Sequence, residues 1–232
     1  MLKNRHILKS ENYLLALQKI IPLWHEDIHI FNTSIMKKII LISFFLLSLS
    51  SCSMILHHIY GINILNEFNH NHYDNFIDKT TTSCVSIVSS ANQYKEVIEL
   101  GLDTIQKKDL MQPIQLMYFK NNSLNSYHIN CYAKGRFGNL DWNTDNRFNY
   151  YPPKTAVKVK GIQIDLEKIR DIYPFTANCV ENNTIVVFWT LMLEKQSRGA
   201  IDIVIRNLED NQKMEGTNII LINIDKYYID LE

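Results

Sequence analysis

The chain has 232 residues with 24 basic and 24 acidic side chains, so it has no basic surplus with which to bind nucleic acid. Its seven glycines also argue against a glycine-rich loop that cradles phosphate. Residues 1–51 hold six of the basic and three of the acidic side chains, which leaves 18 basic and 21 acidic side chains after Ser51 and a net charge of −3 there. That remainder is long enough to bury the core of one domain.

Residues 36–52, MKKIILISFFLLSLSSC, have the three parts of a secretory signal in order. Two lysines form the n-region, and residues 39–47 form an apolar h-region shorter than the roughly twenty residues of a membrane span. The tetrad Leu49-Ser50-Ser51-Cys52 resembles the lipobox of bacterial lipoproteins, where signal peptidase II cuts before the cysteine and the thiol receives a diacylglycerol. The resemblance implies a lipid anchor on Cys52, with the protein in the cell envelope and facing the periplasm of a Gram-negative bacterium.

The position of this signal divides the chain into four segments. A lipoprotein signal belongs at an N-terminus, so residues 1–35 are expected to be an extension upstream of the true start at Met36. The alternative is a real amphipathic extension, because its apolar residues fall near helical spacing. Residues 36–51 are then the signal peptide, residues 52–83 a tether rich in asparagine and histidine, and residues 84–232 a single α/β domain.

The cysteines give no sign of a redox or zinc centre. If Cys52 carries lipid, Cys84, Cys131 and Cys179 remain, so at most one disulfide forms in an oxidising compartment. None of them belongs to a CxxC pair. The alternative for at least two of them is that they are buried free thiols that pack as small apolar side chains.

The first half of the predicted domain reads as a helix followed by a hairpin. Apolar residues at helical spacing predict one helix over residues 88–110, which Pro113 ends. Residues 114–119 and 127–133 are expected to be strands joined by the Asn-Asn-Ser turn at 121–123. A loop over residues 135–153, a short strand within 157–164 and a short helix over 166–173 complete this half.

The second half holds the clearest unit of the chain. TIVVFW at residues 184–189 and NIILINI at 218–224 have the continuous apolar character of strands that are buried on both faces. Between them, residues 200–208 form an amphipathic helix that Gly216 is expected to cap. A strand, helix and strand of these lengths predict a right-handed parallel crossover.

This crossover resembles the first crossover of the thioredoxin-like fold. In that family a buried strand ends in Phe-Trp, as Phe188-Trp189-Thr190 does here, and the next strand ends near an aspartate, as Asn223-Ile224-Asp225 does. The family's CxxC motif opens the intervening helix, but this chain has Leu193-Glu194-Lys195-Gln196 in that place. Thiol–disulfide exchange needs two thiols, so the resemblance implies the α/β fold without the redox activity.

The order of the elements departs from the family's order. The family continues after this crossover with a helix, a hairpin and a last helix, whereas this chain has a helix, a hairpin and a helix before the crossover. A circular permutation, a simple truncation with an added β-hairpin, and an unrelated α/β sandwich are the three alternatives. The permutation requires the hairpin of residues 114–133 to share a sheet with residues 184–189.

The loop at residues 135–151 concentrates arginine and aromatic side chains, the types that dominate binding hot spots. Alternatively, the aromatic side chains pack beneath the loop as a satellite cluster. The candidate binding residues are Arg136, Phe137, Trp142, Arg147 and Tyr150.

Two groups of possible metal ligands occur, and neither predicts a metal site. His57, His58, His70 and His72 lie in the expected tether, where solvated histidines are the simpler interpretation. Residues 141–146 have the alternating oxygen spacing that opens an EF-hand loop, but Pro152 stands where a bidentate glutamate is required. An asparagine- and aspartate-rich turn is the simpler interpretation there.

The sequence therefore predicts a lipid-anchored, redox-inactive thioredoxin-like domain that binds or scaffolds at the envelope, without a cofactor or catalytic residues. Its expected partners are the membrane, through the lipid, and an envelope protein or a small ligand. Two alternatives remain open. One is an envelope enzyme or ligand-binding protein that uses the 135–151 loop, and the other is an oxidoreductase that acts through cysteines outside a motif.

Overall fold

The computed structural model describes residues 61–80, 84–136, 139–158, 162, 164–175 and 183–231. All of them belong to one compact unit that spans Ile55–Glu232. The predicted signal peptide, Cys52 and Cys179 lie outside the described residues. Within the described part of the chain, no helix has the length and apolar character needed to cross a membrane.

A five-stranded mixed sheet forms the centre of the unit. Three of its strands run parallel, and the remaining two form an antiparallel hairpin at one side. Strand β6 is buried at every position from Thr184 to Trp189, which fits its continuous run of β-branched and aromatic residues. In order across the sheet, the strands are β1 (Val85–Val88), β7 (Thr217–Asn223), β6 (Asn183–Trp189), β2 (Gln115–Lys120) and β3 (Ser123–Ile129).

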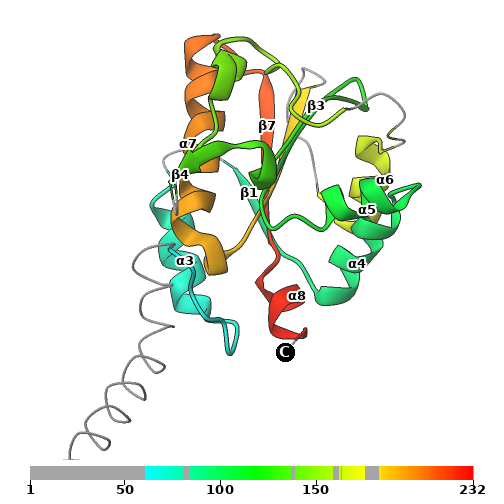
Figure 1. Cartoon of the computed structure of the whole chain (residues 1–232), viewed down its shortest axis with the longest axis vertical. Helices are drawn as coiled ribbons and strands as arrows, with labels where there is room; N and C mark the ends of the chain where they lie inside the picture. Colours follow the sequence, from blue (N-terminus) through cyan, green and yellow to red (C-terminus); the bar gives the residue numbers. More distant parts are fainter. Residues whose placement is uncertain are drawn as a thin grey trace, which may run out of the picture. The chain divides into compact units, whose positions relative to one another are not determined.

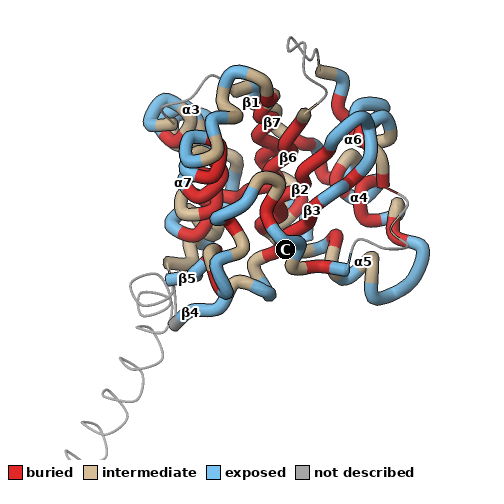
Figure 2. Tube along the Cα trace, turned by 90° about the horizontal axis from the view of Figure 1, so that it is seen from above, coloured by how far each residue is buried: buried red, intermediate tan, exposed pale blue. Residues whose placement is uncertain are grey.

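Helices cover both faces of this sheet, so the unit has three layers (Figure 1). Figure 2 shows buried strands between α3 and α7 on one side and α4 and α6 on the other. This arrangement confirms the predicted α/β class. One face is covered by α4 (Ala91–Glu99), α5 (Thr104–Leu110), α6 (Leu166–Ile172) and α8 (Asp225–Ile229), and the other by α3 (His70–Asp78) and α7 (Glu194–Asp210).

The strand, helix and strand of the second half are present as β6, α7 and β7. Strands β6 and β7 pair in parallel, as the sequence predicted. The end of α7 differs from the prediction, because the chain closes the helix before it reaches Gly216. The amide of Gln212 donates to the Glu209 carbonyl at 3.0 Å, and that of Lys213 donates to the Leu208 carbonyl at 2.8 Å. These two bonds satisfy the last carbonyls of the helix, with Gln212 at φ 54° in the left-handed position that glycine usually takes.

The predicted hairpin is also present, with its second strand displaced. Asn121 and Asn122 both have positive φ, 47° and 71°, which makes a two-residue hairpin turn. Because this turn is so short, β3 begins at Ser123 instead of the predicted 127 and ends at Ile129. Strand β2 pairs antiparallel with β6, so the hairpin shares a sheet with residues 184–189.

The single helix predicted over residues 88–110 is two helices. Val88 ends β1, and Ser90 then begins α4 with a capping box to Gln93. Asp103 begins α5 by accepting a bond from the Gln106 amide at 2.8 Å. Each of these side chains bonds to a backbone amide that is free at the start of a helix. The apolar residues keep their helical spacing across this region, but the backbone forms two separate helices.

The segment expected to be a tether contains a packed helix. Asn69 begins α3 by accepting from the His72 amide at 3.0 Å. Phe76 is 1% exposed and joins the apolar cluster between α7 and the sheet. The tether prediction followed the asparagine- and histidine-rich composition of the segment, although Tyr73, Phe76 and Ile77 stand at helical spacing and pack on this cluster.

Candidate functional site

The loop of residues 135–151 forms a small hairpin of β4 (Lys134–Arg136) and β5 (Asn139–Asp141), followed by a short 3₁₀ segment. Trp142 is 6% exposed and Phe148 is 2% exposed, and both pack in the cluster beside α7. These aromatic side chains are therefore used for packing and do not form an open surface.

Of the candidate binding residues, Trp142 is buried, whereas the side chains of Arg147 and Tyr150 contact different charged groups. Tyr150 is 54% exposed, and the Lys154 ammonium lies 4.7 Å above its ring. Arg147 lies 3.3 Å from the Asp145 carboxylate. Phe137 and the side chain of Arg136 lie outside the described residues.

Residues 141–146, which have the spacing of a calcium-binding loop, form a turn that is held by hydrogen bonds within the loop. The Asp141 carboxylate accepts from the Asn143 backbone amide at 3.1 Å, and the side-chain oxygen of Asn143 accepts from the Phe148 backbone amide at 2.8 Å. Asp145 faces the cations of Arg147 and Lys134. Among the residues that the structure describes, no group of three or more histidine, cysteine or acidic side chains could hold a metal ion.

A buried polar cluster lies at the carboxyl ends of β6 and β7, the end where open α/β sheets usually bind their ligands. Asp225 is 1% exposed and accepts three hydrogen bonds there. The donors are the Thr190 hydroxyl at 2.6 Å, the Leu191 amide at 2.8 Å and the Asn223 side-chain amide at 3.0 Å. Burial raises the pKa of Asp225, and these hydrogen bonds oppose the rise. The carboxylate joins the ends of two strands and has a structural role.

The chain's own earlier segment covers the turn that follows Thr190. The backbone amide of Asn63 donates to the Met192 carbonyl at 2.7 Å, and its side-chain amide donates to the Leu191 carbonyl at 2.6 Å. The nearby imidazole of His72 lies 3.0 Å from the Glu194 carboxylate, which begins α7. The backbone of this turn is thus bonded within the protein.

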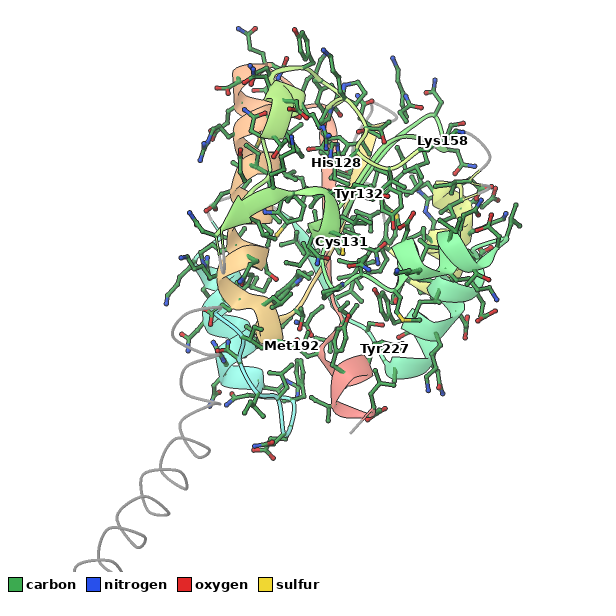
Figure 3. The ribbon with its side chains drawn as sticks, in the orientation of Figure 1. His128, Cys131, Tyr132, Lys158, Met192 and Tyr227 are labelled. Atoms are coloured by element: carbon green, nitrogen blue, oxygen red, sulfur yellow. The ribbon has the colours of Figure 1, made fainter. Side chains whose placement is uncertain are left out.

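The described cysteines lie elsewhere. Cys131 is exposed, and its thiol donates to the Gln112 side-chain carbonyl at 2.7 Å. Figure 3 shows Cys131 well separated from Met192 in the turn before α7. Cys84 is partly buried, and this burial raises its pKa. A raised pKa at Cys84 disfavours the thiolate that thiol catalysis requires.

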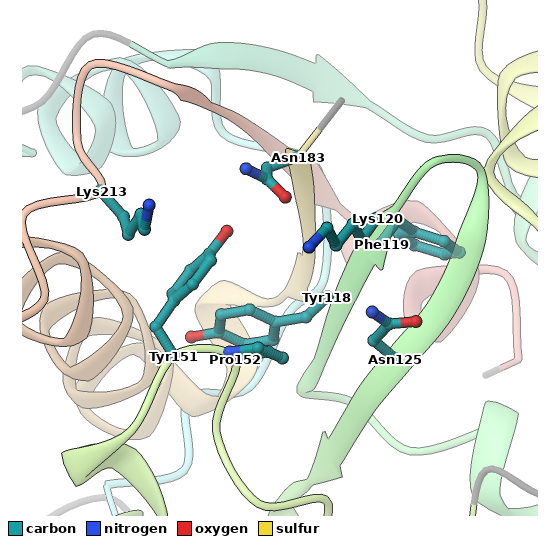
Figure 4. A pocket seen from close by; sticks show the side chains of 8 residues that line it. All are labelled: Tyr118, Phe119, Lys120, Asn125, Tyr151, Pro152, Asn183 and Lys213. Atoms are coloured by element: carbon teal, nitrogen blue, oxygen red, sulfur yellow. The ribbon is translucent and has the colours of Figure 1, made fainter. Parts of the chain in front are cut away.

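A pocket of about 150 Å³ lies at the opposite end of the sheet, beside the amino end of β6 (Figure 4). Lys120 at the end of β2 is the cross-strand partner of Asn183 at the start of β6. Strand β3 bulges at Asn125, since Tyr118 pairs with Ser126 and Phe119 with Leu124. Bulges often redirect side chains beside functional sites. The pocket is lined by Tyr118, Phe119, Lys120, Asn125, Tyr151, Pro152, Asn183 and Lys213.

A buried histidine lies beside Tyr118 of the pocket lining, with the two ring centroids 6.4 Å apart. His128 is 2% exposed, and its Nε2 lies 3.0 Å from the Ser126 hydroxyl. Burial, together with the nearby charge of Arg147, lowers the pKa of His128 to about 3. The imidazole is therefore neutral at neutral pH and packs 4.6 Å from the Phe148 ring.

The sequence did not reveal the pocket because its lining comes from separate segments of the chain. Lys120 precedes the hairpin turn, whereas Lys213 follows α7, and nothing local relates them. The Asn-Asn turn was the one sequence signal near the site, and it predicted only the hairpin.

Comparisons with known proteins do not assign this chain to a family. No family model matches it, and neither a curated protein nor a solved structure matches it.

Proposed function

We propose that this protein is a redox-inactive binding domain of thioredoxin-like type, held at the cell envelope by a lipid on Cys52. Its fold would be a permuted form of that family. The hairpin β2–β3 lies beside β6 in one sheet, as the permutation requires. The lipobox at residues 49–52 supports the anchor.

The observation that carries the proposal is the turn between Thr190 and α7. In the thioredoxin-like family this place presents the reactive thiols, and here it has Leu193 and Gln196. Asn63 also covers it with two hydrogen bonds to backbone carbonyls. A turn without a thiol, and covered by the protein itself, favours binding elsewhere on the molecule over thiol exchange.

An insulin-reduction assay on the purified full chain in detergent tests this proposal, with an active thiol oxidoreductase as the positive control. We expect no turnover above the rate of the reductant alone, because burial raises the pKa of the Cys84 thiol and the described cysteines, Cys84 and Cys131, are not paired with each other. Reductase activity that disappears in Cys131→Ser or Cys179→Ser would overturn the proposal and support an oxidoreductase.

A further inference from the structure

We infer that the pocket beside the amino end of β6 binds a small organic anion, either a carboxylate or a phosphate monoester. The inference gives a ligand class to the binding role proposed above. It rests on the pocket and not on the covered turn, which lies at the other end of the sheet. Its failure would therefore be distinguishable from a failure of the redox-inactive proposal.

The charge of the lining favours an anion. Neither the Lys120 ammonium nor the Lys213 ammonium makes an ion pair or a hydrogen bond with a described residue. Every other lining residue is neutral. Two unpaired cations beside one small pocket attract an anion and repel a cation. The neighbouring Glu181 lies outside the described residues.

The polar groups of the pocket converge on one space. In Figure 4 the ends of the Lys120, Lys213, Asn183 and Tyr151 side chains point toward a common region. Each lysine ammonium can donate three hydrogen bonds to an oxyanion. The arrangement can therefore hold several oxygens of one carboxylate or phosphate group.

The backbone fixes several of these groups before a ligand arrives. The two carbonyl bonds at the end of α7 determine where Lys213 leaves the helix. The Tyr151 hydroxyl lies 3.2 Å from the Thr217 hydroxyl, which holds its ring beside the pocket. The bulge at Asn125 turns that residue out of the regular ladder. A site arranged in advance loses less conformational entropy on binding.

The volume and the walls limit the ligand. A pocket of about 150 Å³ matches cavities that accept a single benzene ring, so the ligand has about six to ten heavy atoms. The rings of Tyr118, Tyr151 and Pro152 supply apolar walls against which a small ring or alkyl group can pack.

Titration calorimetry on the purified full chain in detergent tests the inference with three probes. Benzoate represents the carboxylates, methyl phosphate represents the phosphate monoesters, and benzamide is the neutral counterpart of benzoate. We expect at least one anion to bind with a 1:1 stoichiometry, and we expect its affinity to fall as salt is added. Benzamide should bind at least about fivefold more weakly than benzoate if benzoate is the anion that binds.

Variants assign the binding to the pocket. Lys120→Gln and Lys213→Gln should each weaken the bound anion at least about fivefold. Lys195→Gln is the matched control, because Lys195 is an exposed lysine near the opposite end of α7 and does not line the pocket. Lys120→Arg should retain binding, which separates the loss of charge from a loss of folding. The inference is overturned if neither anion binds, or if the lysine variants bind as the wild type does.

Discussion

The ring of Phe76 in α3 lies stacked on the indole of Trp189 at the end of β6, with centroids 4.2 Å apart and planes 12° from parallel. The Arg198 guanidinium of α7 lies 4.2 Å from the centroid of the Phe76 ring. Tyr73, one turn earlier in α3, stacks on the same indole at 5.7 Å. Aromatic and cation–π contacts therefore join α3 to the sheet and to α7.

This stack leads to a prediction on stability. Trp189→Ala and Phe76→Ala should each lower the free energy of unfolding by about 3–5 kcal/mol, because each removes a fully buried ring. The double variant should lose less than the sum of the two, by about 0.5–1.5 kcal/mol, since the rings contact each other. Urea denaturation followed by circular dichroism measures these values.

Tyr150→Ala is the control for this pair. Its ring is 54% exposed, so its removal should change the free energy of unfolding by less than about 0.5 kcal/mol. A loss below about 1 kcal/mol for Trp189→Ala would show that the strand end is not part of the core. Strict additivity of the two changes would show that the rings do not interact.

His128 predicts a loss of stability in acid. Its pKa is lowered to about 3 in the folded protein, against about 6.5 in the unfolded chain. Between these values the unfolded chain binds a proton that the folded protein does not bind. The free energy of unfolding should therefore decrease as pH falls from about 6.5 toward 3, by on the order of 4 kcal/mol in total.

His128→Gln isolates this effect, because an amide can still bond to Ser126 but does not titrate. The variant should have a flatter dependence of stability on pH below 6.5 than the wild type. Asp225 acts in the opposite direction, since its raised pKa favours the folded protein in acid, so only the difference between the two proteins is informative. Equal pH profiles of wild type and His128→Gln would contradict the prediction.

Gln212 offers a stabilising substitution. It stands at φ 54° after α7, a left-handed conformation that costs a residue with a Cβ about 1–2 kcal/mol. Gln212→Gly removes this cost and adds some entropy to the unfolded chain, so it should raise the free energy of unfolding by about 0.5–1 kcal/mol. The midpoint of urea denaturation measures the gain. Gln212→Ala keeps the Cβ and should give no gain, and a destabilising Gln212→Gly would show that the helix end has another conformation.

The lipobox predicts the fate of Cys52. Cys52→Ala should prevent both lipid attachment and cleavage by signal peptidase II, because the thiol that receives the lipid is absent. A larger precursor should accumulate on a gel, and incorporation of labelled palmitate should be lost. Cys131→Ser is the matched control, and it should be processed as the wild type is. Unchanged mobility and labelling of Cys52→Ala would contradict the lipoprotein interpretation.

Several elements were predictable from the sequence because their information is local. The runs at residues 184–189 and 218–224 are apolar without interruption, which is typical of strands that are buried on both faces. They form β6 and β7. The Asn-Asn pair tolerates positive φ, so the hairpin turn was evident. Ser90 and Asp103 are also local helix-start signals, and the apolar period that runs across them concealed the break between α4 and α5.

The remaining features depend on contacts between distant segments. The spacing of Tyr73, Phe76 and Ile77 marks an apolar face on α3, but it does not indicate that Trp189 covers that face. Lys120 and Lys213 become neighbours of one pocket only when β2 pairs with β6 and α7 packs on the sheet. The sequence by itself determined β2, β6, β7, the helix α7 between the last two, and the hairpin turn, because backbone propensity and apolar patterning act over a few residues. The tertiary structure decided the packing of α3 on the sheet and the position of the pocket, because side chains far apart in sequence meet only after the sheet has formed.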